Sequence, residues 1–140
     1  MTGINKFDVA LSFAGEQRDY VEEVAHIIQS SGYVVFYDEF YESHLWGKEL
    51  TAYFKEVYYS NSDKCIMFVS KEYVTKAWPS TERKNALAKV LEVGDDYLLP
   101  VRFDDSEVCG LPPTIGYLDA RKKTPKNIAD LFLEKMESES

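Results

Sequence analysis

The chain has 140 residues, a formal net charge of −8, 45% hydrophobic residues and only two cysteines. This length fits a single globular domain with one hydrophobic core. The acidic charge disfavours nonspecific binding to nucleic acid or to an anionic membrane, because a polyanion would be repelled. The cysteines and histidines show no metal-ligand spacing. The first residues lack the apolar core of a signal peptide, and no apolar run reaches the length of a membrane span. We therefore expect a cytoplasmic protein without a bound metal.

The first part of the chain alternates strand and helix patterns. Residues 7–13 alternate as a strand does, and Gly15 interrupts them. One face of this strand is predicted to carry Phe7, Val9, Leu11 and Phe13, and the other Ala10 and Ser12. Residues 16–31 carry apolar side chains at helical spacing and are followed by Gly32, a typical C-terminal cap. Residues 33–37 are aromatic or β-branched, which predicts a second strand, covered on both faces.

The central part contains a long irregular stretch and the most apolar strand. Residues 38–47 show no regular period and are predicted to form a long loop. Residues 48–60 return to helical spacing, and residues 65–69 are continuously apolar, which predicts the central strand. The remaining predicted elements are a helix at 79–93, strands at 97–101 and 116–119, and a final helix at 125–136. Pro100 cannot donate a ladder hydrogen bond, so we expect it near a sheet edge or at a strand end.

The alternation predicts an α/β fold of the flavodoxin-like kind, with five parallel strands and helices on both faces of the sheet. We expect one domain over residues 1–140, with a core at about residues 6–136 and a tail or the start of a linker at 137–140. Ligands of such folds bind beyond the carboxyl ends of the strands. The segments that should meet at that edge are residues 13–15, the 38–47 stretch, Ser70 and residues 103–104.

One predicted helix places a carboxylate and an indole on the same face. Trp78 and Glu82 are four residues apart, and Pro79 suits the first position of a helix. Glu82 would stand at the edge of an otherwise apolar stripe that faces the sheet. It is either a functional acid or a rim carboxylate that pairs with a neighbour such as Lys89.

Several chemistries known in such folds are excluded by the residues present. A response regulator needs an acidic pair after its first strand and an aspartate after its third, where this chain has Phe13, Ala14 and Ser70. The chain has neither a GxGxxG loop after its first strand nor a GxxxxGK[ST] loop, which excludes a Rossmann pyrophosphate site and a P-loop. No serine or cysteine has an obvious histidine partner.

Five motifs follow one another along the chain: FDVALSFAGE from Phe7, VFYDE from Val35, LWGKEL from Leu45, CIMFVS from Cys65 and WPSTE from Trp78. As an ordered set they resemble the Toll/interleukin receptor (TIR) domain family, most of all its bacterial branch. The resemblance implies the fold described above, with residues 38–47 as the family's assembly loop. It also implies other TIR domains as partners, up to a filament, in bacterial defence, host interaction or signal transduction.

The resemblance further implies an activity. In TIR domains that are enzymes, a glutamate four residues after a tryptophan cleaves NAD at the nicotinamide bond, and Glu82 and Trp78 match that pair. This implies an NAD glycohydrolase with NAD as substrate, no cofactor, and Glu82 as catalytic residue. The residues implied to bind the substrate are Phe13, Ala14, Gly15, Trp46, Lys48 and Trp78.

The chemistry suits a single carboxylate. Nicotinamide leaves NAD as a neutral molecule, because the bound ring is a pyridinium, so no general acid is needed. Positive charge develops on the ribose, where Glu82 could stabilise it while Trp46 or Trp78 stacks on a ring. Attack by water would give ADP-ribose, and attack by the adenine a cyclic isomer.

Several alternatives stay open on the sequence alone. The plant-type pattern has Arg where this chain has Ala14, so Lys48, Arg18 and the N–H groups of residues 14–15 are all candidates to hold the pyrophosphate. Residues 13–14 could simply end a strand, Trp46 could be a buried anchor of the long loop, and Trp78 a core residue. The alternative functions are a noncatalytic adaptor that binds only other TIR domains and a nucleoside glycosyl-transferring enzyme of similar fold.

Overall fold

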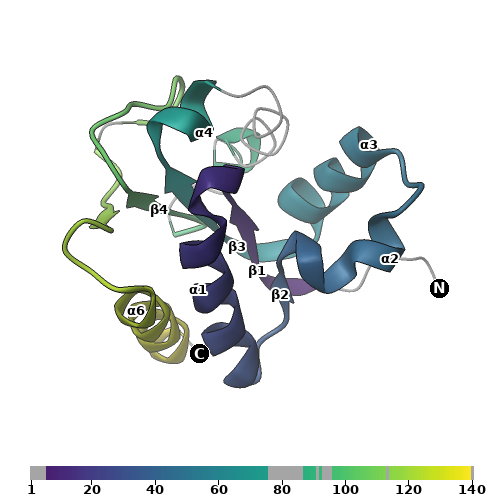
Figure 1. The fold of residues 1–140 in the computed structure, drawn as a ribbon, viewed down its shortest axis with the longest axis horizontal. Helices are drawn as coiled ribbons and strands as arrows, with labels where there is room; N and C mark the ends of the chain where they lie inside the picture. Colours follow the sequence, from purple (N-terminus) through teal and green to yellow (C-terminus); the bar gives the residue numbers. More distant parts are fainter. Residues whose placement is uncertain (1–5, 76–86, 91, 93–95, 113, 140) are drawn as a thin grey trace.

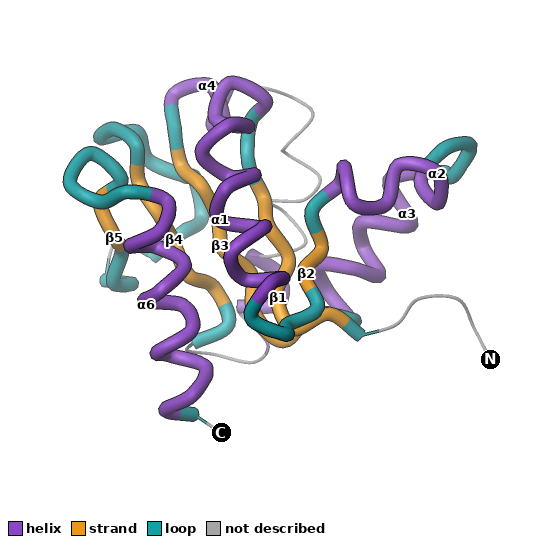
Figure 2. Tube along the Cα trace, turned by 60° about the horizontal axis from the view of Figure 1, so that its bottom comes forward, coloured by secondary structure: helices purple, strands orange, loops and turns teal. Residues whose placement is uncertain are grey.

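The computed structural model describes residues 6–75, 87–90, 92, 96–112 and 114–139. They form a five-stranded sheet, parallel throughout, in the order β2-β1-β3-β4-β5. Its strands are β1 (Phe7–Ser12), β2 (Val35–Phe36), β3 (Ser62–Val69), β4 (Leu98–Arg102) and β5 (Leu118–Asp119). Figure 2 shows this order from β2 on the right to β5 on the left. The predicted fold class is confirmed, and β3 is the central strand as predicted.

Helices cover both faces of the sheet (Figure 1). On one face, α1 (Arg18–Ser30) and α6 (Pro125–Ser138) pack beside each other. On the other face, α3 (Leu50–Lys55) continues into a π-helical turn, η3 (Glu56–Ser60). The shorter helical elements are η1 (Gly15–Gln17), η2 (Asp38–Tyr41), α2 (Glu42–Leu45) and α4 (Lys71–Thr75). Residues 87–90 are also helical, but most of the helix predicted at 79–93 lies outside the described residues.

The core has two layers, because the parallel strands are covered on both faces. Leu11 and Phe13 pack with α1 and α6 in one cluster, and Ala10 packs with α3 and η3 in the other. Phe7 departs from the alternation predicted for its strand. Its ring centre lies 5.3 Å from that of Phe36, in the cluster on the α3 side. The first residue of β1 therefore faces away from α1, unlike Leu11 and Phe13.

The stretch predicted as a loop at residues 38–47 is largely helical, because η2 and α2 occupy most of it. Each of these elements is only four residues long, too short to show a helical period in the sequence. Gly47 follows them with φ at +86°, a conformation that other residues rarely adopt. The side chain of Glu49 then accepts the N–H of Ala52, so the helix predicted from residue 48 begins at Leu50 instead.

Pro100 lies inside β4, in register with Met67 of β3, and not at a strand end. β5 pairs with Val101 and Arg102, so it begins alongside β4 only after Pro100. The predicted position near a sheet edge is therefore correct. The two outermost strands, β2 and β5, have two residues each.

Candidate active site

The topological switch point of the sheet lies between β1 and β3. The chain crosses from β1 to β2 on one side and then returns past β1 to β3 on the other, so the connections diverge at this place. Open α/β sheets bind their ligands here, beyond the carboxyl ends of the strands. Phe13, Ala14 and η1 follow β1, and Ser70 and α4 follow β3. These segments form the edge at which the sequence predicts the active site.

Three buried hydroxyl groups tie the two segments together. The Ser12 hydroxyl lies 2.6 Å from the Tyr73 hydroxyl. Ser70 accepts the N–H of Tyr73 at 3.0 Å and donates to Oε1 of Gln17 at 2.9 Å. The side chains of Ser12, Ser70 and Tyr73 are at most 1% exposed, where an unpaired hydroxyl would be costly. The start of α4 is therefore fixed against the end of β1.

Asp104 brings the end of β4 to the same edge. Its carboxylate accepts the N–H groups of Lys71 and Ser106, both at 2.9 Å, and the N–H of Phe103 donates to the Val69 carbonyl. Burial alone would raise the pKa of Asp104, but the hydrogen bonds from Ser106 and Lys71 outweigh it and hold that pKa below its ordinary 3.8. Residues 103–104 therefore join the edge, as the sequence predicts.

Asp104→Ala should lower the free energy of unfolding by about 1 kcal/mol near neutral pH, because two backbone N–H groups lose their acceptor. A folded-state pKa below the unfolded one stabilises the fold above the unfolded value and stops doing so as the pH falls through the folded value. The difference from wild type should therefore shrink below pH 3.8. Urea unfolding at several pH values measures it, with the exposed Glu107→Ala as control. A difference that grows with acidity would contradict this role.

Directly after β1, a ligand can reach the backbone of the chain more easily than its side chains. Phe13 and Ala14 are 6% and 0% exposed, so their side chains belong to the core. Gly15 is exposed, and a side chain added there would meet open space. Of the three substrate-binding candidates after β1, Gly15 is thus the one that a ligand can approach directly.

Arg18 is held by carboxylates. Its guanidinium makes a two-pronged contact with Asp38 at 3.0 and 3.1 Å and an ion pair with Glu39 at 2.9 Å. It also donates to the Tyr37 hydroxyl and lies 5.1 Å from the Phe13 ring centre. The hydrogen bond to Asp38 is the largest of the effects that raise the pKa of Arg18. Two carboxylates thus oppose its single charge, which disfavours Arg18 as a ligand of the pyrophosphate.

Trp46 is 89% exposed, which excludes the alternative of a buried anchor. It lines a cleft of about 610 Å³ together with residues of η2 and α2 and with Arg18. Three carboxylates, from Asp38, Glu39 and Glu42, also line that cleft. Lys48 is exposed two residues further along the chain. The structure therefore places Trp46 beside the β2 end of the sheet, one strand away from the switch point.

Trp78 and Glu82 lie outside the described residues, as does the rest of the chain between α4 and residue 87. Lys89, the neighbour considered as a partner for Glu82, is described. Its ammonium donates to the carbonyl of Ser62 and lies 4.5 Å from the Tyr97 ring centre. Ser62 begins β3, so Lys89 reaches the amino end of that strand, opposite the edge of the switch point.

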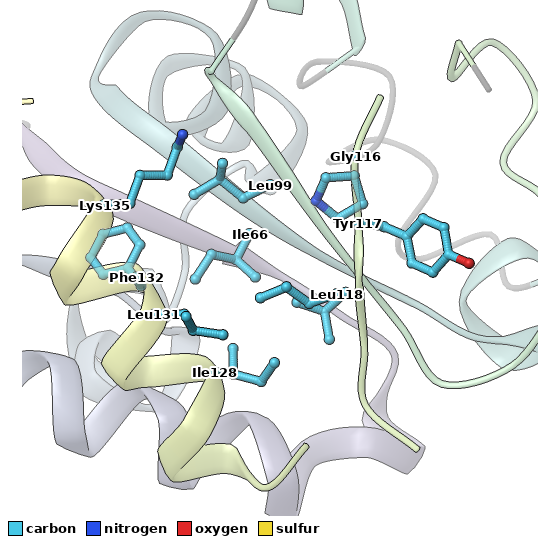
Figure 3. A pocket seen from close by; sticks show the side chains of 11 residues that line it. Ile66, Leu99, Gly116, Tyr117, Leu118, Ile128, Leu131, Phe132 and Lys135 are labelled. Carbon is cyan, nitrogen blue, oxygen red and sulfur yellow. The ribbon is translucent and has the colours of Figure 1, made fainter. Parts of the chain in front are cut away.

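A separate apolar cavity of about 270 Å³ lies between α6 and the β4–β5 side of the sheet. Figure 3 shows aliphatic side chains around it, among them Leu99, Ile128 and Leu131, with Lys135 at its rim. The Lys135 ammonium is already ion-paired with Asp96. The described residues that line this cavity include no carboxylate for a reaction on a sugar, so it is not assigned to the site at the switch point.

Within the described part of the chain, no three His, Cys, Asp or Glu residues are grouped to hold a metal ion. Cys65 is buried and Cys109 exposed, and no disulfide joins them. Every described helix is too short or too polar to cross a membrane.

Sequence comparison agrees with the motifs. The family model "TIR domain" matches residues 9–132. A curated relative, the 3' cyclic ADP-D-ribose synthase AaTIR of Aquimarina amphilecti, is 42% identical over 134 residues. That match covers 96% of this chain but 41% of the relative, so the chain spans less than half of the relative's length.

Solved structures show the same fold. The TIR domain of the Toll-related receptor TRR-2 from Hydra magnipapillata superimposes with a TM-score of 0.71 at 16% identity, covering 96% of this chain and 98% of that one. A TIR-STING receptor from C. gigas gives a TM-score of 0.65 at 15% identity, covering 93% of this chain and 41% of that one. Because the family model spans most of the chain and the fold agrees with it, the chain belongs to the TIR domain family.

Proposed function

We propose that the chain is an NAD glycohydrolase, which breaks the bond between nicotinamide and ribose. The observation that carries the proposal is the 42% identity, over 96% of this chain, to a relative named for the synthesis of cyclic ADP-ribose. A product of that kind retains the ADP-ribose part of NAD, so its formation requires the nicotinamide to leave. The switch point at the carboxyl ends of β1 and β3 supports the proposal, because an open α/β sheet takes its ligand there.

In the proposed mechanism Glu82 is the catalytic residue. Its carboxylate stabilises the positive charge that develops on the ribose as nicotinamide departs. Trp78, four residues earlier, or Trp46 stacks on a ring of the substrate. Water or a group of the ADP-ribose itself then attacks the ribose carbon, giving either ADP-ribose or a cyclic isomer.

We further propose how the pyrophosphate is held. The exposed backbone at Gly15 is open to a ligand, and Lys48 is exposed. Arg18 is a weaker choice, since Asp38 and Glu39 already neutralise it. The pyrophosphate is therefore assigned to the Gly15 backbone and Lys48.

The direct test is incubation of concentrated protein with NAD, with the products separated by mass. Free nicotinamide together with ADP-ribose or a cyclic isomer would support the proposal and identify the product. A deoxynucleoside offered in parallel tests the nucleoside-transferring alternative, because release of its base in place of nicotinamide would favour that enzyme. Self-association without turnover of either compound would favour the adaptor.

We also propose that the activity depends on self-association in the cytoplasm, as part of a bacterial defence or host-interaction response. The indole of Trp46 is 89% exposed and lies beside a cleft of about 610 Å³, in the segment implied to be the assembly loop. A large exposed aromatic side chain of this kind is typical of contact surfaces between proteins.

Turnover per molecule should consequently rise with protein concentration. Where most of the protein is monomeric, the assembled fraction grows at least in proportion to concentration, and specific activity should grow with it until assembly is complete. Nicotinamide release and sedimentation, measured on the same samples, check this. Equal specific activity in dilute, demonstrably monomeric protein and in concentrated protein would remove the dependence on assembly.

A further inference from the structure

Glu72 is a carboxylate of the described residues that stands at the switch point itself. It is the second residue of α4, directly beyond the end of β3, and its side chain is half-buried. Gln17, the last residue of η1, donates from Nε2 to Oε1 of Glu72 at 3.2 Å. This hydrogen bond joins the segment after β1 to the segment after β3, so Glu72 lies at the edge of the sheet where an open α/β fold takes its ligand.

The hydrogen bonds around Gln17 fix the orientation of that carboxylate. An ionised carboxylate only accepts, so the amide nitrogen of Gln17 must face Glu72 and the amide oxygen must face Ser70. The Ser70 hydroxyl accordingly donates to Gln17, while it accepts the N–H of Tyr73. Ser70 is 1% exposed, and each donor and acceptor in this chain of bonds agrees with the next. Glu72 is thus oriented by the half-buried Gln17, which the buried Ser70 holds in turn, as binding carboxylates are oriented by their neighbours.

A carboxylate held in this way distinguishes hydroxyl groups from phosphate groups. Each of its oxygens has two lone pairs, so after accepting from Gln17 it can still accept from hydroxyls. A pair of adjacent ribose hydroxyls supplies such donors, whereas a phosphate ester at the same position brings a like charge and no donor. In dinucleotide sites of α/β folds, an acid near a strand end accepts from the ribose 2′-hydroxyl and disfavours the 2′-phosphate.

We infer that Glu72 accepts hydrogen bonds from the hydroxyls of the adenosine ribose and thereby selects NAD over NADP, which carries a 2′-phosphate there. The inference rests on the proposed function and deepens it. In that scheme Glu82 serves the reacting ribose, and Glu72 serves the second ribose of the same dinucleotide. Glu72 is a binding and specificity residue, and the bond that breaks does not involve it.

The test compares NAD with NADP in wild type and in Glu72→Gln. Glutamine keeps the shape and can still accept from Gln17, but it removes the negative charge. Wild type should prefer NAD in kcat/KM, and the ratio of the NAD value to the NADP value should fall about tenfold in the variant, mainly because the NADP value rises. Glu134→Gln, on the exposed side of α6, removes the same charge elsewhere and should leave the ratio unchanged. A merely structural role for Glu72 would alter both substrates alike.

A binding measurement separates failure of the inference from failure of the proposed function. Calorimetric titration of Glu82→Ala with NAD and with NADP measures binding without turnover. Adding Glu72→Gln to this variant should lower the ratio of the NADP Kd to the NAD Kd by about tenfold, as for kcat/KM. An unchanged Kd ratio, or no binding of either dinucleotide, would overturn the inference. If the Kd ratio shifts as expected while wild type releases no nicotinamide, the proposed reaction fails and the role of Glu72 stands.

Discussion

Replacing Glu82 by alanine should reduce nicotinamide release from NAD by about 100-fold or more, because nothing then stabilises the positive charge that develops on the ribose. The departing group is neutral and needs no general acid, so the negative charge of Glu82 is the whole of its assigned contribution. Glu82→Gln should be nearly as slow, since it keeps the shape and removes the charge. The loss should appear in kcat more than in KM, because the interaction strengthens as the bond breaks. Nicotinamide release, followed at saturating NAD, measures the effect.

Glu134→Ala is the matched control for this prediction. It removes one glutamate from the exposed face of α6 and should leave the rate unchanged. Unfolding curves of Glu82→Ala should match those of wild type, which shows that the loss is not one of folding. A rate within tenfold of wild type would refute the assignment of Glu82 as the catalytic residue.

Phe68→Ala should cost about 3–5 kcal/mol of the free energy of unfolding, through lost burial and the cavity that remains. Phe68 is fully buried in the central strand. Its ring centre lies 6.2 Å from that of Phe103 and 6.5 Å from that of Tyr20, which themselves lie 4.9 Å apart. These rings join β3 to α1 and to the end of β4. The whole free energy of unfolding of a domain is about 5–15 kcal/mol, so the variant should be only marginally stable.

Urea unfolding measures this loss as a lower midpoint with an unchanged dependence on urea concentration. Val34→Ala is the control, because Val34 is apolar but 44% exposed, and it should change stability by no more than about 0.5 kcal/mol. If Phe68→Ala cost as little as Val34→Ala, the ring would be replaceable and the described packing would not hold the sheet together. Loss of activity in Phe68→Ala should follow the unfolded fraction.

The sheet could be predicted from the sequence because its signals are local. The apolar run at residues 65–69 is buried on both sides in the central strand, as its composition indicates. Gly32 has φ at +97° just beyond α1, as a C-terminal cap requires. Thr124 and Asn127 cap each other's backbone N–H groups at the start of α6.

The site was less predictable, because its contacts join distant parts of the chain. Gln17 and Glu72 are 55 residues apart, and neither belongs to a recognisable motif. Their places, just beyond the ends of β1 and β3, were a usable signal, since that edge was already expected to bind the ligand. The sequence makes Arg18 a candidate phosphate ligand because its charge is visible there. Its pairing with Asp38 is not visible, because it depends on how β2 lies beside β1.

The assignment of Trp46 shows the same limit. Tryptophan is mostly buried in folded proteins, so the sequence alone could not show that Trp46, at the end of α2, is exposed to solvent. Trp78 and Glu82 fall outside the described residues, so their assignment remains a prediction from the motif. The Glu82→Ala experiment is therefore the most informative of those described.

The shortness of β2 and β5 has a consequence for a protein proposed to work in crowded assemblies. An outer strand with many free backbone groups is a template on which another chain can add, and this is a common route to aggregation. Here each outer strand has two residues, and Pro100 removes one more backbone donor beside β5. Copies of this domain can therefore gather at high local concentration with little pairing between their outer strands. Ordered association between copies then depends on contacts between side chains.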